Sequence, residues 1–200
     1  MNLMGLALLI GAGTYAAAWI AFAIVGRDPS GTAWLPLNLL VVAGSIGIAA
    51  GLPALHALQR HQAGALGTVA TALLFVGFLL AGVARQSVEA FTLPVMSTVP
   101  PAADVLVAVA GPLLFIGMVT LGIVTLRAGV YPPWTGAALV LAALAGAFAA
   151  YVRIPTALHF SISAAAALIL AYLGLLVVSA ARRARPTPGR GAPPAPPVRP

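Results

Sequence analysis

Residues 35–55 read LPLNLLVVAGSIGIAAGLPAL and contain no charged side chain. A helix needs about 20 mainly apolar residues to cross the hydrocarbon core of a bilayer. The backbone in lipid must satisfy its own hydrogen bonds, so an apolar run of this length predicts a transmembrane helix. This stretch therefore places the chain among integral membrane proteins.

Five further segments have the same character: residues 3–25, 64–84, 103–126, 134–152 and 156–180. All are continuously apolar, without the alternation of a membrane β-barrel. The first follows an uncharged Met1-Asn2 and is longer than the roughly 7–15 residues of a signal-peptide core, so we expect it to be retained. The sequence predicts an all-α fold, a polytopic bundle of six transmembrane helices within residues 1–181.

Composition excludes several soluble classes. Of the 200 residues, 62% are hydrophobic and 6% are charged, whereas a soluble domain has about 25% charged residues. Such a chain cannot cover a water-facing globule with charge. The absence of cysteine excludes a disulfide scaffold, a thiolate metal site and a cysteine nucleophile.

The distribution of arginine predicts the orientation. All ten cations are arginines, and five of them lie in the proline-rich segment 182–200, which we expect to be a disordered tail. Six helices put both termini on one side, with seven arginines against three. The positive-inside rule then predicts a multi-pass protein of the cell inner (plasma) membrane with both termini in the cytoplasm.

The arginines of the tail also suggest a partner. Arg182, Arg183 and Arg185 are expected to contact anionic lipid headgroups of the bilayer. No aromatic residue is interspersed among them, so nucleic acid is not an expected partner.

The longest predicted connection is RQSVEAFTLPVMSTVPPA, residues 85–102. Its three prolines, Pro94, Pro100 and Pro101, predict that no long helix forms there. We expect this loop to lie against the membrane surface or to cap the bundle.

Among polar residues in the predicted helices, Asn38 is the most costly to leave unpaired. It is a candidate for solute or partner contact. The alternative is an interhelical hydrogen bond, worth about 0.6–2 kcal/mol.

Charged residues of the predicted outer side form a second candidate site. Glu89, Asp104, Arg85 and Arg153 could gather there as a vestibule for a cation or substrate. The alternative is ordinary ion pairing between loops, worth about 0–1 kcal/mol.

His159 is the ionisable residue that lies furthest inside a predicted span. Paired histidines between helices can hold haem, but the predicted topology puts His56 and His159 near opposite membrane surfaces. We therefore expect no cofactor and no metal site. His159 is a candidate for solute or partner contact, and the alternative is a hydrogen bond to a neighbouring helix.

The two halves of the chain share one spacing. Arg27 and Trp34 are seven residues apart after the first predicted helix, as are Arg127 and Trp134 after the fourth. Three helices per half would make a repeat inverted, as in many secondary transporters. Coincidence in a biased composition is the alternative.

Gly47 and Gly51 have GxxxG spacing, which lets helix backbones approach closely. We expect this stripe to serve packing within the bundle, with homodimerisation as the alternative.

No GxSxG, HExxH, Walker or dinucleotide motif is present in the sequence. We therefore expect a non-enzymatic membrane protein that acts through packing or association, as an accessory subunit with a membrane-protein partner or as a homodimer. The alternative is a small transporter or channel for a neutral or weakly polar solute. A haem-binding electron carrier is a further alternative.

Four stretches carry a resemblance: HQAGALG (61–67), VGFLLAGV (76–83), VEAFTLPVMSTVP (88–100) and LRAGVYPPW (126–134). They resemble a group of uncharacterised bacterial multi-span membrane proteins with about six helices. The resemblance implies an integral bacterial membrane protein and no particular activity.

Overall fold

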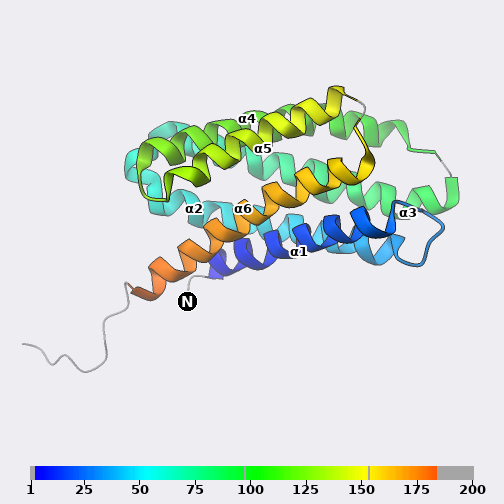
Figure 1. The fold of residues 1–200 in the computed structure, drawn as a ribbon, viewed down its shortest axis with the longest axis horizontal. Helices are drawn as coiled ribbons and strands as arrows, with labels where there is room; N and C mark the ends of the chain where they lie inside the picture. The colour runs from blue at the N-terminus through cyan, green and yellow to red at the C-terminus, as the bar shows by residue number, and fades with distance from the viewer. Residues whose placement is uncertain (1–2, 97, 153, 184–200) are drawn as a thin grey trace, which may run out of the picture.

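The structure is a computed structural model that describes residues 3–96, 98–152 and 154–183. Within these residues every regular element is helical, which confirms the all-α prediction. The elements lie side by side along one long axis (Figure 1). They are α1 (Leu3–Val25), α2 (Trp34–Gly77), the π-helix η1 (Phe78–Arg85), α3 (Gln86–Met96), α4 (Pro101–Ala128), α5 (Pro133–Tyr151) and α6 (Thr156–Arg183).

The described residues contain five long apolar helices, where six were predicted. The difference arises because α2, η1 and α3 form one helical run, Trp34–Met96, which covers two predicted segments. The predicted connection at residues 56–63 is helical, since it holds no glycine or proline and consists mostly of good helix formers.

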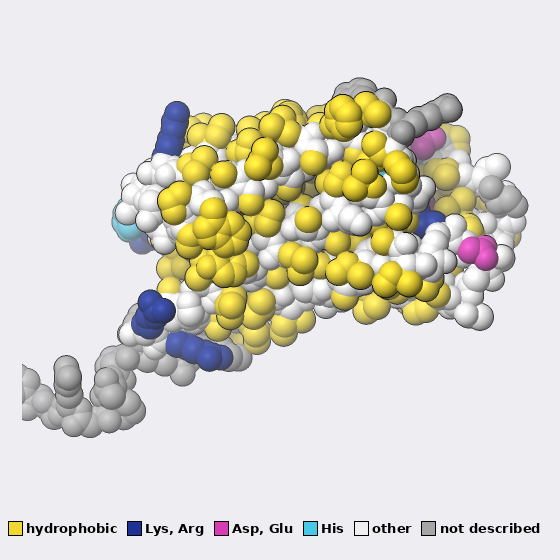
Figure 2. Space-filling model, in the orientation of Figure 1, with side chains coloured by type: hydrophobic (Ala, Val, Ile, Leu, Met, Phe, Trp, Pro, Cys, Tyr) yellow, Lys and Arg dark blue, Asp and Glu magenta, His cyan; other side chains and the backbone are white. Residues whose placement is uncertain are grey.

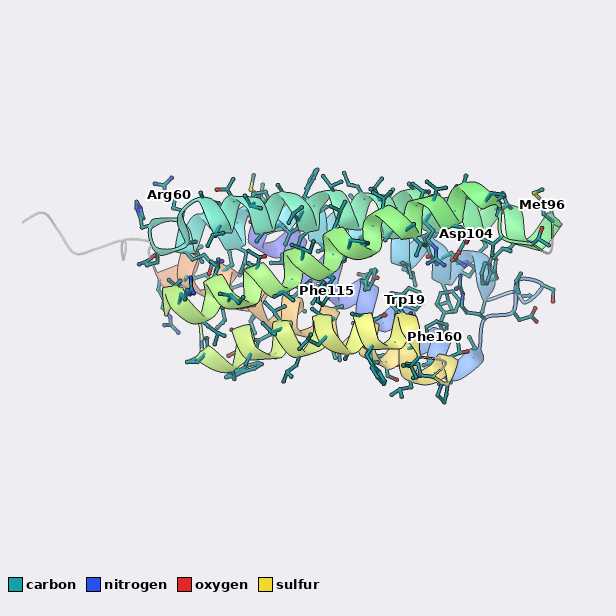
Figure 3. The ribbon with its side chains drawn as sticks, turned by 90° about the horizontal axis from the view of Figure 1, so that it is seen from above. Trp19, Arg60, Met96, Asp104, Phe115 and Phe160 are labelled. Atoms are coloured by element: carbon teal, nitrogen blue, oxygen red, sulfur yellow. The ribbon has the colours of Figure 1, made fainter. Side chains whose placement is uncertain are left out.

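The long run nevertheless reverses direction at Gly64. This residue has φ 54° and ψ −149°, which are not helical angles. Beyond it the chain turns back, so that the Thr68 hydroxyl lies 3.3 Å from Nε2 of His56. We call residues 34–63 the first arm and residues 65–96 the second arm; the turn lies beside Arg60 in Figure 3.

The prediction that residues 85–102 lack a long helix is wrong. The second arm stays helical to Met96 and includes Pro94. This proline falls two residues before the helix ends, so it disturbs the last turn alone. Pro100 is the N-cap of α4 and Pro101 is its first residue, where a missing N–H costs nothing.

The bundle has two distinct ends. The Arg60 end contains the start of α1, the Gly64 turn, the α4–α5 connection and the end of α6. The Glu89 end contains the α1–α2 turn, the last turns of the second arm, the start of α4 and the α5–α6 connection. Arg60 and Asp104 lie at opposite ends in Figure 3.

Glycines bring the helices into backbone contact. A Cβ added to Gly11 of α1 would lie 2.5 Å from the carbonyl carbon of Gly47, and one added to Gly51 would lie 2.3 Å from Cβ of Leu8. Gly122 of α4 and Gly136 of α5 meet in the same way. The GxxxG stripe thus packs inside the bundle, as expected.

The outer surface is largely apolar (Figure 2). Large side chains such as Leu141 and Phe148 of α5 are 65% and 61% exposed. A surface of this kind is compatible with contact to lipid.

Candidate functional site

Three charged side chains meet at the Glu89 end. Nη2 of Arg27 and Nη2 of Arg85 each lie 2.6 Å from a different carboxylate oxygen of Glu89. Arg85 and Glu89 are one helical turn apart on the second arm, while Arg27 comes from the turn that follows α1. We call Arg27, Arg85 and Glu89 the charged cluster.

The charged cluster carries one more positive charge than negative. The Glu89 side chain is 1% exposed, and those of Arg27 and Arg85 are 23% and 27% exposed. The Nε atoms of both arginines are buried and have no hydrogen-bond partner in residues 3–96, 98–152 and 154–183. Because a buried charge is costly unless it is paired, the extra cation leaves the site with capacity for an anion.

Aromatic rings support Arg27 from one side. Its guanidinium carbon lies 5.1 Å from the ring centre of Trp34 and 5.9 Å from that of Phe22. Both rings belong to a buried cluster that includes Trp19 and Phe160. The rings of Trp19 and Phe160 have centroids 5.0 Å apart (Figure 3). Cation–π contact of this kind stabilises a partly desolvated guanidinium.

Buried amides join the two arms next to the charged cluster. Asn38 is fully buried; its Nδ2 donates to the carbonyl oxygen of Trp34 at 2.7 Å, and its Oδ1 accepts from Nε2 of Gln86. Trp34 Nε1 donates to the carbonyl oxygen of Ala90 at 3.2 Å. Asn38 thus forms an interhelical hydrogen bond, which is one of the two roles considered for it from the sequence.

A cavity of about 330 Å³ lies beside the charged cluster. Its polar lining consists of Arg27, Thr156 and His159; the other lining residues are Ala149, Ala150, Val152, Ile154 and Phe160. Thr156 and His159 belong to the first turn of α6. The cavity therefore combines a cation, a helix N-terminus and apolar walls.

The structure brings together some of the predicted site residues and not others. Glu89 and Arg85 do meet, but Asp104 is exposed in the first turn of α4 and forms no ion pair within the described residues. Arg153 lies outside the described residues. His159 is exposed, and its placement at the Glu89 end separates it from His56.

Sequence reasoning missed Arg27. One signal was available, since the α1–α2 turn falls on the same side as residue 89 in any six-helix topology. The helical i,i+4 pairing of Arg85 with Glu89 was not predicted either, because these residues were assigned to a loop.

A second polar group lies at the Arg60 end. Gln59 is fully buried, and within the described part of the chain neither of its side-chain amide atoms has a hydrogen-bond partner. The hydroxyl of buried Thr125 also has no partner among these residues. The Tyr131 hydroxyl donates to the carbonyl oxygen of Leu55 at 3.3 Å, and burial raises the pKa of Tyr131. A cavity of about 200 Å³ there is lined by Tyr131 and Arg183, among others.

No family model, curated protein or solved structure matches this chain. The resemblance of residues 61–100 to bacterial multi-span proteins therefore stays a prediction.

Proposed function

We propose that this chain is a six-span integral protein of a bacterial inner membrane that acts through association with another membrane protein, as a non-enzymatic accessory subunit. Its two arms count as separate spans, because each exceeds the roughly 20 residues needed to cross a bilayer. Single helical spans of this kind satisfy their own backbone hydrogen bonds in lipid.

The arrangement of charge supports an orientation. Arg60, Arg127, Arg182 and Arg183 lie at the Arg60 end, whereas all three acids of the chain lie at the Glu89 end. Figure 2 shows dark blue side chains gathered at the first end and magenta ones toward the second. The positive-inside rule places the Arg60 end in the cytoplasm.

The observation that carries the proposed role is the division of buried polar groups between the two ends. In the middle of the bundle, between its two ends, Ser45 is fully buried. Its hydroxyl donates to the carbonyl oxygen of Val41 in its own helix. A Cβ added to Gly82 would lie 2.0 Å from the Ser45 hydroxyl oxygen, so the helices are closely packed there. Among the described residues, the buried polar side chains other than Ser45 belong to one end or the other, and this division favours a protein that acts through its surface.

Native mass spectrometry of the protein, gently extracted from its host membrane, tests this role. We expect a stoichiometric complex with a second membrane protein. A bare monomer after extraction in several mild detergents would contradict the proposal.

Three open glycines allow the partner surface to be mapped. A Cβ added to Gly13, Gly111 or Gly146 meets no described atom within 4 Å, so a leucine variant at each position begins its side chain in open space. We expect one of these variants to lose the partner while the other two retain it. If all three retain the partner, the contact lies away from these helix faces.

A specific observation favours the transporter alternative. In the first half, α1 packs against the first arm and α6; in the second half, α4 packs against α5 and the second arm. If α1, the first arm and the second arm are replaced by α4, α5 and α6, and the reverse, the same contacts result. An inverted repeat requires this correspondence between the halves. This alternative predicts that glycerol enters proteoliposomes faster than empty vesicles and that Asn38→Leu changes the rate of entry. A rate equal to that of empty vesicles would contradict the alternative.

A further inference from the structure

We propose that the cavity beside the charged cluster binds an anionic phosphate group, held by the guanidinium of Arg27 and the first turn of α6. This site is independent of the accessory role proposed above. The phosphate can belong to a lipid headgroup or to a free phosphate ion, and the experiment below separates the two sources.

The first argument is the charge balance. Two guanidinium groups share the single carboxylate of Glu89, and both of its oxygens are engaged. Of the other two acids, Asp28 directs its carboxylate to the amide and hydroxyl of Ser30, at 2.9 and 2.7 Å. Asp104 forms no ion pair among the described residues. Within the described residues, one positive charge thus remains without a counter-ion.

The second argument is that the cation faces the cavity. Arg27 lines the cavity directly, and its Nη2 is the atom bound to Glu89, while its buried Nε has no partner. A guanidinium presents five N–H donors in a planar fork that suits phosphate oxygens. The Trp34 and Phe22 rings lie within cation–π distance of this guanidinium.

The third argument is that the N-terminal turn of α6 lines the cavity. Thr156 and His159 line it from the first helical turn. The N-terminus of a helix carries a partial positive charge, which favours an anion. The amides of Leu158 and His159 already donate to the carbonyl oxygen of Pro155, at 2.9 and 3.1 Å, so these two amides are not available to the anion. The Thr156 hydroxyl and the His159 imidazole add two further donors.

The walls and the position suit a phosphate at the surface of a bilayer. A volume of about 330 Å³ is at the lower end of the roughly 300–1,000 Å³ typical of small-molecule sites. Five of the eight lining residues are apolar. An organic group attached to a phosphate at Arg27 would thus lie next to apolar side chains.

The test uses the full-length protein purified in an uncharged detergent. Native mass spectrometry measures binding of dioleoyl phosphatidylglycerol against dioleoyl phosphatidylcholine, and tryptophan fluorescence measures binding of inorganic phosphate. We expect Arg27→Gln to weaken binding of the anionic probe about tenfold, the value of a charged hydrogen bond. The matched control is Arg60→Gln, which removes an exposed arginine at the opposite end and should leave binding unchanged.

A second variant keeps the test decisive if Arg27→Gln fails to fold. Glu89→Gln removes the competing carboxylate, so it should raise the affinity for the anionic probe several-fold, a change that unfolding cannot mimic. Binding of phosphatidylglycerol that depends on Arg27 identifies a lipid headgroup as the source, and binding of inorganic phosphate alone identifies the free ion. Equal binding by the wild type, Arg27→Gln and Glu89→Gln would overturn the proposal.

Discussion

Glu89 shows how one residue can fix the packing of three chain segments. Its carboxylate joins the α1–α2 turn to the second arm through Arg27 and Arg85. It is also the most deeply buried of the three charges. A buried ion pair contributes little compared with an apolar core, but removal of one partner leaves the other charges uncompensated.

Glu89→Ala should therefore destabilise the bundle by about 2–4 kcal/mol. This is somewhat less than for a fully buried ion pair, because the two arginines keep some contact with solvent. Reversible unfolding in mixed detergent micelles measures the free energy of unfolding of the variant. Asp104→Ala removes an exposed acid with no ion pair in the described residues and serves as the control. Equal stability of the two variants would show that the charged cluster is not structural.

Asp28 offers a pH-dependent effect outside the helices. Hydrogen bonds from the Ser30 hydroxyl and amide hold the pKa of Asp28 below its ordinary value. A carboxyl with a lowered folded-state pKa stabilises its turn above the unfolded-state pKa, and this contribution disappears as the pH falls through the folded-state pKa. In Ser30→Ala the pKa of Asp28 should rise toward the ordinary value, as an NMR titration would detect. An unchanged pKa would mean that the hydroxyl bond is not formed in solution.

At the scale of single elements, glycine contacts decide how closely α1 and α2 approach. Gly11 and Gly13 lie two residues apart on α1, but a Cβ on Gly11 would overlap the backbone of α2, whereas one on Gly13 meets nothing within 4 Å. Gly11→Ala should destabilise the bundle by about 1–3 kcal/mol, as overpacking usually does. Gly13→Ala should be neutral or stabilise it by about 0.5–1 kcal/mol. Thermal unfolding of both variants in detergent compares them, and a stable Gly11→Ala variant contradicts the close approach.

Gly64 is the element-scale feature that turns one helical run into two arms. Its angles, φ 54° and ψ −149°, fall in a region that glycine alone adopts readily, at a cost of about 1–3 kcal/mol for other residues. A Cβ at this position has open space around it, so the penalty in Gly64→Ala is conformational. Gly146→Ala is equally open but helical, and should lose nothing. Unfolding free energies of the pair measure the strain of the turn.

The sequence was sufficient to predict the helices but not their ends. Apolar length located all the long helical segments, because the bilayer thickness sets that length. Residues 56–63 were predicted as a connection, and so were residues 85–102, because Pro94, Pro100 and Pro101 were expected to prevent a long helix there. Residues 56–63 are helical because they consist mostly of good helix formers. Residues 86–96 are also held by tertiary bonds, such as Gln86 to Asn38 and Arg27 to Glu89, which no local pattern contains.

At the scale of the whole molecule, the absence of cysteine makes the proposed topology directly testable. Single cysteines can be placed at Ser30, in the α1–α2 turn, and at Gln62, near the Gly64 turn. Intact cells treated with a membrane-impermeant maleimide should label Ser30→Cys and leave Gln62→Cys unlabelled until the cells are opened. Labelling of both positions from outside would contradict a single span, the first arm, between them.

The candidate site was predictable only in part at this scale. Opposite charges on one side of a bundle suggested that Glu89 would meet an arginine, which the structure supports for Arg85 and Arg27. The cavity was not predictable, because it depends on how the start of α6 lies against the α1–α2 turn. Such a juxtaposition of segments more than a hundred residues apart is set by packing alone.

The one-turn spacing of Arg85 and Glu89 has a consequence for biogenesis. With the Arg60 end in the cytoplasm, synthesis of the second arm must deliver both charges through the apolar layer to the far surface. An isolated carboxylate or guanidinium crosses hydrocarbon at a high energetic cost. Once the arm is helical, the two groups neutralise each other at 2.6 Å, so they can be translocated together as a near-neutral unit before Arg27 is in reach.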